Sequence, residues 1–365
     1  MGLQCGIVGL PNVGKSTLFN AISNNKAEVA NFPFCTIKPN VGIINVPDER
    51  LNILRDLVQP EKVIPASIEF LDIAGLVRGA SKGEGLGNKF LANIREVDAI
   101  IHLIRCFDDE NIAHVKGIID PVADKEVIDM ELQLKDLESV NKRISRIEKV
   151  AKSGDAPARK TLEKLNKYKA WLEQGKNVRS MPVDAEDEEV IKDFFLLTAK
   201  PVIYVANIDE NSLPEGNHYV ELLRDQIKNE KAKIIVISAS IEAQIAELED
   251  PEERIMFLKE YNLNESGLDK LIRASYALLD LITFFTAVPK EIRAWTIKKG
   301  WKAQKAAGVI HTDFEKGFIK AEVIKLSDLN HYGTVTACKE AGRVSIEGKE
   351  YVIKDGDIVY FRFNV

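Results

Sequence analysis

Residues 9–17 constrain the fold of this chain more than any other stretch. They read Gly-Leu-Pro-Asn-Val-Gly-Lys-Ser-Thr and fit the phosphate-binding loop pattern G-x-x-x-x-G-K-S/T. The apolar residues 5–8 just before the loop are typical of a buried strand, and residues 18–22 just after it are typical of the start of a helix. Because a strand, this loop and a helix follow in that order, the sequence predicts an α/β domain that binds phosphate.

The individual residues of the loop indicate how it would hold a nucleoside triphosphate. Its glycines let the backbone wrap so that successive N–H groups face phosphate oxygens, and the start of the following helix adds positive potential. We expect Lys15 to reach the outer phosphates and the Ser16 hydroxyl to coordinate Mg²⁺. The other loop residues that we expect to contact the nucleotide are Asn12, Val13, Gly14 and Thr17.

Two further motifs supply groups that a nucleotide-dependent switch requires. Asp72 and Gly75 form a D-x-x-G pattern directly after the apolar residues 68–71. Asp72, at a strand end, can hold Mg²⁺ through a water molecule, and the Gly75 N–H can sense the γ-phosphate. Thr36, at the end of the segment Phe-Pro-Phe-Cys-Thr, is placed to give Mg²⁺ a second hydroxyl, as in switch loops that the γ-phosphate orders. We therefore expect Ser16 and Thr36 to bind the metal, and Lys15, Thr36, Asp72 and Gly75 to serve catalysis.

The segment that follows Gly75 combines a glycine-rich composition with an inert side chain. Glycines at 79, 83, 85 and 87 disfavour regular structure and predict a mobile lid over residues 79–87. Many GTPases carry a glutamine directly after the D-x-x-G motif, where it orients the attacking water. Leu76 occupies that position here and cannot form a hydrogen bond through its side chain, so another group must position the water.

The expected base-reading motif departs from the one that recognises guanine. GTPases use N-K-x-D, in which the aspartate accepts hydrogen bonds from guanine. In this chain Asn207 is kept, Ile208 replaces the lysine, and Glu210 replaces the aspartate with one more methylene. We therefore expect adenine, with the Asn207 amide on its N7 and N6 edge and Ile208 against its face. Asp209 offers a carboxylate one residue before the position of the aspartate in N-K-x-D, so guanine binding stays an alternative. The loop expected to close the base pocket contains Ser238, Ala239 and Ser240.

Short apolar runs with helical patterns between them predict a mostly parallel sheet covered by helices. These runs lie at residues 43–46, 68–71, 99–105, 202–206 and 234–238. The alternation stops between about residues 118 and 200, where apolar residues recur three and four positions apart on either side of the turn at 153–155. This spacing predicts an antiparallel helical hairpin inserted into the α/β domain. Its apolar positions are Leu137, Val140, Ile144 and Ile147, then Leu162, Leu165, Tyr168 and Leu172.

The hairpin carries a strong positive bias. Residues 141–180 contain 12 Lys or Arg and 4 Asp or Glu, a net charge of +8 by subtraction, whereas the whole chain has a net charge of −6. Such a bias favours contact with a polyanion, although a solvated helix surface is the alternative. The acidic residues 184–189 that follow are typical of a solvated helix start.

The rest of the sequence indicates where the domains begin and end. From about residue 281, alternating apolar patterns broken by glycines predict a small, mostly β domain, in which His311 and His331 are expected to be structural. We therefore expect a phosphate-loop domain in two parts, 1–117 and 201–280, with the helical insertion at 118–200 and the last domain at 281–365. The four cysteines are scattered without metal-ligand spacing, and no apolar run is long enough for a membrane span, so we expect a cytoplasmic protein with reduced thiols.

Together these motifs resemble the YchF-type Obg-like ATPase family of translation-factor-related P-loop proteins. The resemblance covers essentially the whole chain. It rests on residues 9–17, 32–36, 72–89 and 207–210, and on residues 311–318, His-Thr-Asp-Phe-Glu-Lys-Gly-Phe, which resemble the signature of a β-grasp TGS domain. The resemblance implies a P-loop domain with a C-terminal TGS domain, a preference for ATP over GTP, slow Mg²⁺-dependent hydrolysis and association with the ribosome.

The resemblance also assigns a candidate for the water-positioning group. Family members carry a hydrophobic residue in place of the catalytic glutamine, as Leu76 does, and a histidine after the fourth strand that serves hydrolysis. His114 matches that histidine, although by itself it is a lone loop residue. We expect a monomeric ATPase switch that meets the large ribosomal subunit or the 70S particle, with rRNA bound by the basic hairpin and the TGS domain. A GTPase, a non-hydrolysing adenine-nucleotide sensor and, less well supported, a metabolic P-loop kinase are the alternatives.

Overall fold

The computed structural model describes residues 3–24, 40–73, 86–112, 117–182, 194–230 and 232–364. Within them a central six-stranded sheet has the strand order β2-β4-β1-β5-β6-β7. Its neighbouring strands run parallel except β2, which pairs antiparallel with β4. The strands span Gln4–Val8 (β1), Val41–Asn45 (β2), Ser67–Asp72 (β4), Ala99–Arg105 (β5), Val202–Asn207 (β6) and Lys233–Ile237 (β7).

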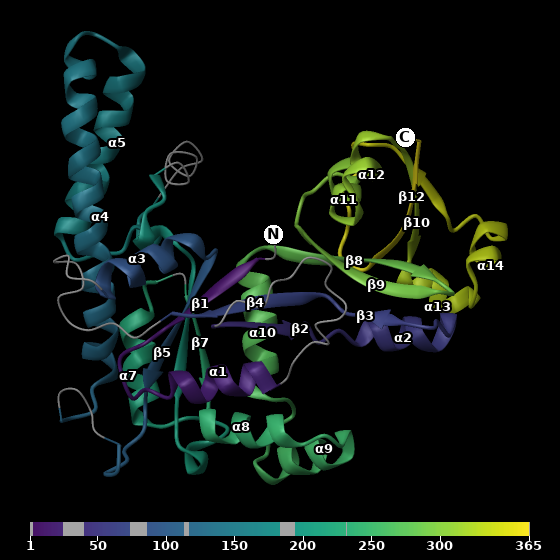
Figure 1. Ribbon diagram of the computed structural model, residues 1–365, viewed down its shortest axis with the longest axis horizontal. Helices are drawn as coiled ribbons and strands as arrows, with labels where there is room; N and C mark the ends of the chain where they lie inside the picture. Colours follow the sequence, from purple (N-terminus) through teal and green to yellow (C-terminus); the bar gives the residue numbers. More distant parts are fainter. Residues whose placement is uncertain are drawn as a thin grey trace.

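The two middle strands explain why helices cover this sheet. Every residue of β5 and β6 is buried, as expected for parallel strands that are covered on both faces. Figure 1 shows the helices packed around the sheet, with α1 and α8 near each other at one edge of the domain. The expected α/β class is confirmed. The helices span Lys15–Asn24 (α1), Leu86–Glu96 (α3), His218–Ile227 (α7), Ala239–Glu247 (α8), Pro251–Glu260 (α9) and Gly267–Leu278 (α10).

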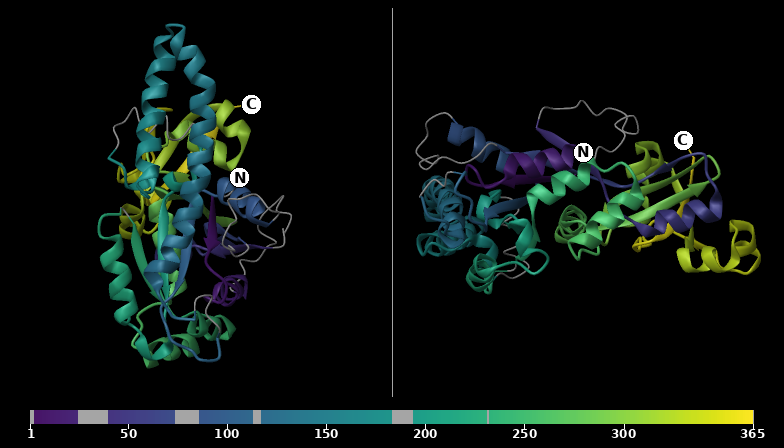
Figure 2. Two further views of the ribbon diagram at one scale, coloured as in Figure 1. Left: turned by 90° about the vertical axis from the view of Figure 1, so that its left-hand side faces the viewer. Right: turned by 90° about the horizontal axis from the view of Figure 1, so that it is seen from below.

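The expected helical hairpin is formed by α4 (Pro121–Lys152) and α5 (Ala156–Glu173). Each helix begins with an aspartate cap and a proline in its first turn: Asp120 accepts from the Ala123 N–H at 2.9 Å, and Asp155 accepts from the Ala158 N–H at 2.7 Å. The hairpin extends away from both sheets (Figures 1 and 2). It has its own apolar core, made of Val140, Leu165, Tyr168, Leu172, Val178, Met181 and Leu196.

A second six-stranded sheet, within the described residues, has the order β11-β10-β12-β8-β9-β3. Four helices accompany its C-terminal strands, so the expected mostly β character of this part is only half right. The helices are too short, at five to eight residues, to leave a clear apolar period. The elements are β8 (Leu281–Val288), β9 (Glu291–Lys298), α11 (Ala303–Ile310), α12 (Thr312–Lys316), β10 (Phe318–Lys325), α13 (Leu326–Tyr332), α14 (Val335–Glu340), β11 (Ser345–Glu347) and β12 (Asp357–Phe363).

One segment of the first half of the chain joins this second sheet. β3 (Val63–Ile64) pairs with β9, and α2 (Glu49–Val58) packs beside it, as Figure 1 shows. Arg50 of α2 forms an ion pair of 2.8 Å with Asp355. Residues of both sheets belong to one continuous apolar core. The two sheets are therefore packed together rather than linked only by chain. Among the described residues, no helix combines the length and apolar character needed to cross a membrane.

Candidate nucleotide-binding site

The predicted phosphate loop lies between the end of β1 and the start of α1. Asn12 and Gly14 adopt positive φ angles of 63° and 92°, which curl the backbone ahead of the helix. Two features require glycine at position 14. Its positive φ angle disfavours other residues, and a Cβ there would lie 2.3 Å from the Asn207 side-chain nitrogen. Val13 is buried and anchors the loop, while Ser16 and Thr17 are exposed on the first turn of α1. The loop thus presents polar groups outward from a fixed base.

Lys15 and Asp72 meet at this loop. The Lys15 ammonium donates a hydrogen bond to the Asp72 carboxylate, and β1 and β4 are paired so that Ile7 lies opposite Asp72. The two side chains are 13% and 22% exposed, so both can still meet a ligand. The Ser16 hydroxyl and the Asp72 carboxylate are hard oxygen donors, the kind that Mg²⁺ prefers. The donors present therefore fit the expected metal.

Asn207 takes a different position from the one that the sequence suggested. Its side-chain nitrogen donates to the Val13 carbonyl at 2.9 Å, and its side-chain oxygen accepts from the Ala239 N–H at 2.9 Å. Both ends of the amide are thus bonded to backbone groups, and the residue is 3% exposed, so only its second N–H and second lone pair are left for a base. Asn207 therefore holds the phosphate loop to the loop at residues 238–240, a role that the sequence did not predict, and its contact with the base stays a prediction.

The neighbours of Asn207 also depart from expectation. Ile208 is 2% exposed within the main apolar core, so its side chain cannot cover a base. Asp209 accepts hydrogen bonds from the N–H and the hydroxyl of Ser212, at 3.1 and 2.8 Å, and caps the short helix η5 (Glu210–Ser212). Glu210 is exposed. Because Asp209 is engaged in this turn, the carboxylate that a guanine site requires is not presented by that residue.

The loop expected to close the base pocket lies at the start of α8. Ser238 is buried, and its hydroxyl lies 3.0 Å from the hydroxyl of Ser240, which is exposed. Ala239 is held by Asn207 as described above. One helical turn further on, Glu242 accepts hydrogen bonds from the N–H groups of Gly267 and Leu268 at 2.6 and 3.1 Å. Burial raises the pKa of Glu242 to about 6, although those two N–H groups oppose the shift.

Curated relatives match this chain along its whole length. The Ribosome-binding ATPase YchF of Bacillus subtilis (strain 168) is 55% identical over 367 residues. Proteins of the same name from Haemophilus influenzae and Escherichia coli O157:H7 are 52% and 50% identical over 365 residues. Each comparison covers 100% of both chains. The chain belongs to the YchF family.

A solved structure and two family models agree with this assignment. The structure described as "Structure of the Schizosaccharomyces pombe YchF GTPase" is 40% identical, with a TM-score of 0.90 over 99% of this chain and 98% of that one. A model described as "50S ribosome-binding GTPase" matches residues 4–149. The model YchF-GTPase_C, described as "Protein of unknown function (DUF933)", matches residues 281–364, the stretch that we expected to be a TGS domain. The bacterial relatives are thus named ATPases, whereas the Schizosaccharomyces pombe relative is described as a GTPase.

Several residues that we expect at a YchF site lie outside the described residues. They are Thr36, Gly75, Leu76 and His114, together with residues 79–85 of the expected lid. Their roles stay predictions. The described part of the site brings together the phosphate loop, Asp72, Asn207 and residues 238–240.

Arg105, which lies opposite Asn207 where β5 pairs with β6, is a buried cation that no sequence motif pointed to. It is 1% exposed at the end of β5, and it donates to the carbonyls of Phe107, Asp109 and Ile112 at 3.1, 3.1 and 2.9 Å. These bonds fold residues 107–112, which lead directly to the segment that contains His114. The sequence did offer one signal for Arg105, since it is a charged residue at the end of the largely apolar run 99–105.

Proposed function

We propose that this chain is a Mg²⁺-dependent ATPase that hydrolyses ATP to ADP and phosphate and acts as a nucleotide switch on the ribosome. One observation carries the proposal: the phosphate loop is built with Lys15 against Asp72, in a chain 50–55% identical over its full length to relatives named ribosome-binding ATPases. Such a loop holds the phosphates, and Mg²⁺ when bound neutralises charge that develops on them.

We assign the following roles within that reaction. Lys15 exchanges its contact with Asp72 for the outer phosphates, and the Ser16 hydroxyl and Asp72 face the metal together with Thr36. The Gly75 N–H senses the γ-phosphate. His114 orients the attacking water, since Leu76 cannot. Single-turnover hydrolysis tests this assignment against a non-hydrolysing sensor: the intact chain should form ADP, and Lys15→Ala should not.

The preference for ATP rests on the base-reading residues as the structure places them. Asp209 is engaged with Ser212, and the exposed carboxylate at position 210 is one methylene longer than the aspartate that reads guanine. Ile208→Lys, which would restore the guanine motif, places a charge in a core position and would destabilise the fold. Glu210→Asp is therefore the better companion variant, and it should raise GTP affinity relative to ATP. The GTPase alternative remains worth testing because the fission-yeast relative is described as a GTPase.

The helical hairpin is the proposed contact with rRNA. Arg146, Lys149 and Lys152 are exposed along the last turns of α4, near the end of the hairpin that lies farthest from the sheets (Figure 1). Arg143 is less suitable than its sequence position suggested, because its guanidinium lies 4.6 Å from the centre of the Phe194 ring and donates to the Phe194 carbonyl at 3.4 Å. A polyanion is the partner that best suits the exposed cations.

Co-sedimentation with ribosomes at several salt concentrations tests this contact. Changing Arg146, Lys149 and Lys152 together to Gln should weaken binding, and the slope of log affinity against log salt should become shallower by about 2 to 3 if each cation neutralises one phosphate. The matched control removes three exposed cations from the α/β domain: Lys228, Lys233 and Lys259, each changed to Gln. Equal binding by both triple variants at every salt concentration would mean that the hairpin is only a solvated surface and would favour the C-terminal domain.

The remaining features of this function are also proposals. We infer that the chain acts as a monomer in the cytoplasm and meets the large ribosomal subunit or the 70S particle. The names of the bacterial relatives support ribosome binding without naming a subunit. Sedimentation with isolated subunits would separate the two particles.

A further inference from the structure

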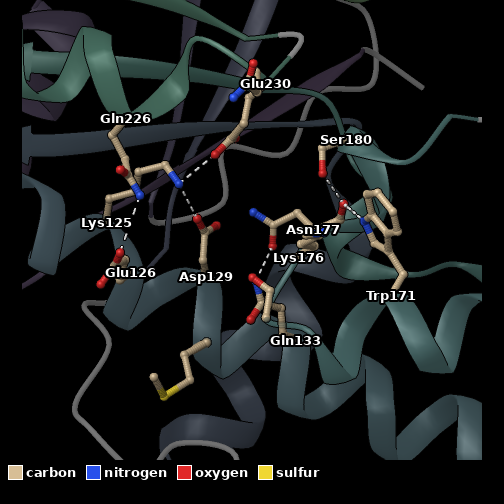
Figure 3. A pocket seen from close by; sticks show the side chains of 13 residues that line it. Lys125, Glu126, Asp129, Gln133, Trp171, Lys176, Asn177, Ser180, Gln226 and Glu230 are labelled. Atoms are coloured by element: carbon tan, nitrogen blue, oxygen red, sulfur yellow. Dashed lines mark hydrogen bonds and ion pairs between the residues drawn. The ribbon is translucent and has the colours of Figure 1, made fainter.

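Four charged side chains form a buried cluster where the hairpin meets the central sheet. Lys125 contacts Asp129 and Glu230 at 2.7 Å each, and Arg179 contacts Asp129 at 2.8 Å. Their side chains are 5–14% exposed. Lys125 and Asp129 belong to α4, Arg179 to the short helix η3 (Val178–Ser180) that follows α5, and Glu230 lies after α7. Figure 3 shows Lys125 between its two carboxylates.

Tyr204 of β6 lies at the centre of this cluster. Its hydroxyl donates to Glu230 at 2.8 Å and accepts from Arg179 at 3.2 Å, and the Lys125 ammonium lies 5.3 Å from the centre of its ring. The fully buried Tyr204 ring also packs against His102 of β5 at 5.5 Å. One side chain of the sheet therefore contacts three charged groups: Lys125 and Arg179 at the base of the hairpin, and Glu230 after α7.

Asp129 and its two cationic partners keep their charges at neutral pH, because the effect of burial is outweighed by the nearby carboxylates, which raise the pKa values of Lys125 and Arg179. Burial alone raises the pKa of Asp129, but the adjacent Arg179 and Lys125 cations outweigh it and lower that pKa to about 2. Burial lowers the pKa of His102 to about 3, so this neighbour is neutral. The cluster holds two basic and two acidic side chains, and replacing any one of them leaves a buried charge without its partner.

The same strand leads from this cluster to the nucleotide site. Tyr204 lies three positions before Asn207, which holds the phosphate loop at Val13 and the neighbouring loop at Ala239. β6 is paired with β5 on one side and β7 on the other, so its two ends cannot move independently by much. A displacement of the hairpin base is thereby linked to both nucleotide loops.

A solvent-open pocket beside the cluster leaves room for such a displacement. Its volume is about 530 Å³, and it lies between α4, the segment after α5 and the end of α7 (Figure 3). The residues around it include Met130, Gln133, Trp171, Asn177, Gln226 and Asn229. The pocket is open to solvent, and Met130 at its edge is 58% exposed, so side chains at this junction can move into it without displacing packed core atoms.

We propose that Tyr204 and the surrounding charged cluster form a joint that couples the position of the hairpin to Asn207, and through it to the nucleotide loops. This inference rests on the proposed function, in which ATP binds one end of the coupled system and the ribosome binds the other. Tyr204 is thus a positioning residue. Coupling between two ligands is reciprocal, so ATP and the ribosome should change each other's affinity by one common factor.

The test is Tyr204→Phe, which keeps the ring and removes only the hydroxyl that bridges Glu230 and Arg179. ATP affinity is measured with and without ribosomes, and ribosome affinity with and without ATP. In the unaltered chain we expect a coupling factor of about 5 to 150, the usual range. In Tyr204→Phe the factor should fall toward 1, while each affinity measured alone changes by less than about threefold. The matched control is Tyr276→Phe, which removes a hydroxyl that bonds Thr283 and Thr296 away from the joint.

A second readout separates failure of the joint from failure of the ribosome as partner. Hydrogen exchange along α4 is measured with and without ATP, in the absence of ribosomes. ATP should change exchange at the base of the hairpin in the intact chain and in Tyr276→Phe, but not in Tyr204→Phe. If the intact chain binds ATP but not ribosomes, the proposed function fails. The ATP-dependent change in hydrogen exchange along α4 still tests whether Tyr204 couples the hairpin to the nucleotide loops. An unchanged coupling factor or an unchanged exchange response in Tyr204→Phe would overturn the joint, as would an intact chain that shows neither effect.

Discussion

Asn207→Ala is the substitution whose effects can be worked out most fully from the structure. It removes two hydrogen bonds of 2.9 Å and leaves the Val13 carbonyl and the Ala239 N–H without their partner. Val13 and Ala239 are 1% and 3% exposed, so water cannot easily replace the lost amide. A buried polar group left unsatisfied costs about 1–3 kcal/mol. We therefore expect the free energy of unfolding to fall by about 2–6 kcal/mol, measured by urea denaturation without nucleotide.

The same substitution should also weaken ATP binding. The phosphate loop and the loop at residues 238–240 would no longer be held together before the ligand arrives, so binding would have to order them. We expect ATP affinity to fall by at least about tenfold, which corresponds to about 1.4 kcal/mol. Isothermal calorimetry with Mg²⁺ measures this change.

Asp136→Ala is the matched control for Asn207→Ala. Asp136 is 1% exposed and accepts from the N–H of Leu197 at 2.9 Å, and from the N–H and hydroxyl of Thr198 at 2.8 and 2.7 Å. It lies in the hairpin, so its loss should lower stability by at least as much and leave ATP affinity unchanged. Normal stability and normal ATP affinity in Asn207→Ala would refute the bridging role. Equal loss of ATP affinity in both variants would show that general destabilisation explains the effect.

A double substitution tests the contact between Asn207 and Gly14 directly. Gly14→Ala should be costly, because its Cβ would lie 2.3 Å from the Asn207 nitrogen and its φ is 92°. In the Asn207→Ala background the clash is gone and only the backbone strain remains. The two costs should therefore be less than additive, by about 0.5–3 kcal/mol. Strict additivity would contradict the contact.

Three further outcomes are expected. Ser16→Ala should abolish hydrolysis at low Mg²⁺ by removing a metal ligand, and normal turnover there would exclude that role. His114→Ala should lower turnover while leaving ATP affinity nearly unchanged, since the contact with the attacking water is made mainly in the transition state; a loss of affinity with normal turnover would make it a binding residue instead. For Glu242, whose pKa rises from 4.5 to about 6 on folding, the folded state binds the proton more tightly. Its contribution to stability should therefore fall by about 2 kcal/mol between pH 4.5 and pH 7 relative to Glu242→Gln, and a constant difference between the two urea titrations would contradict this sign.

The central sheet and the hairpin were predictable because their signals are local. β5 and β6 are unbroken apolar runs, and the apolar residues of α4 and α5 recur at helical spacing. β3 was not predictable, since a strand of two residues has no period and exists through its pairing with β9, more than 200 residues away in the sequence. The four short helices of the last domain were missed for a similar reason.

The site was predictable in its phosphate-binding part but less so around the base. The phosphate loop lies between β1 and α1 as expected, because the strand, the motif and the helix are contiguous in sequence. The contact of Lys15 with Asp72, which is 57 residues away, was not predicted. The partners of Asn207 are contributed by loops 194 and 32 residues away, so no local pattern reveals them. Ile208 was assigned to the base although it continues the buried pattern of β6. Arg105 and Tyr204 were overlooked because each lies inside or at the end of an apolar strand.

The preference for adenine is the claim most open to direct test. The measurement is a pair of calorimetric titrations of the same preparation with ATP and with GTP, in the presence of Mg²⁺. The account predicts that ATP binds at least about tenfold more tightly, because Asp209 is held by Ser212 and the exposed carboxylate at position 210 is displaced by one methylene. Equal or tighter binding of GTP would contradict the preference for adenine and would favour the GTPase alternative.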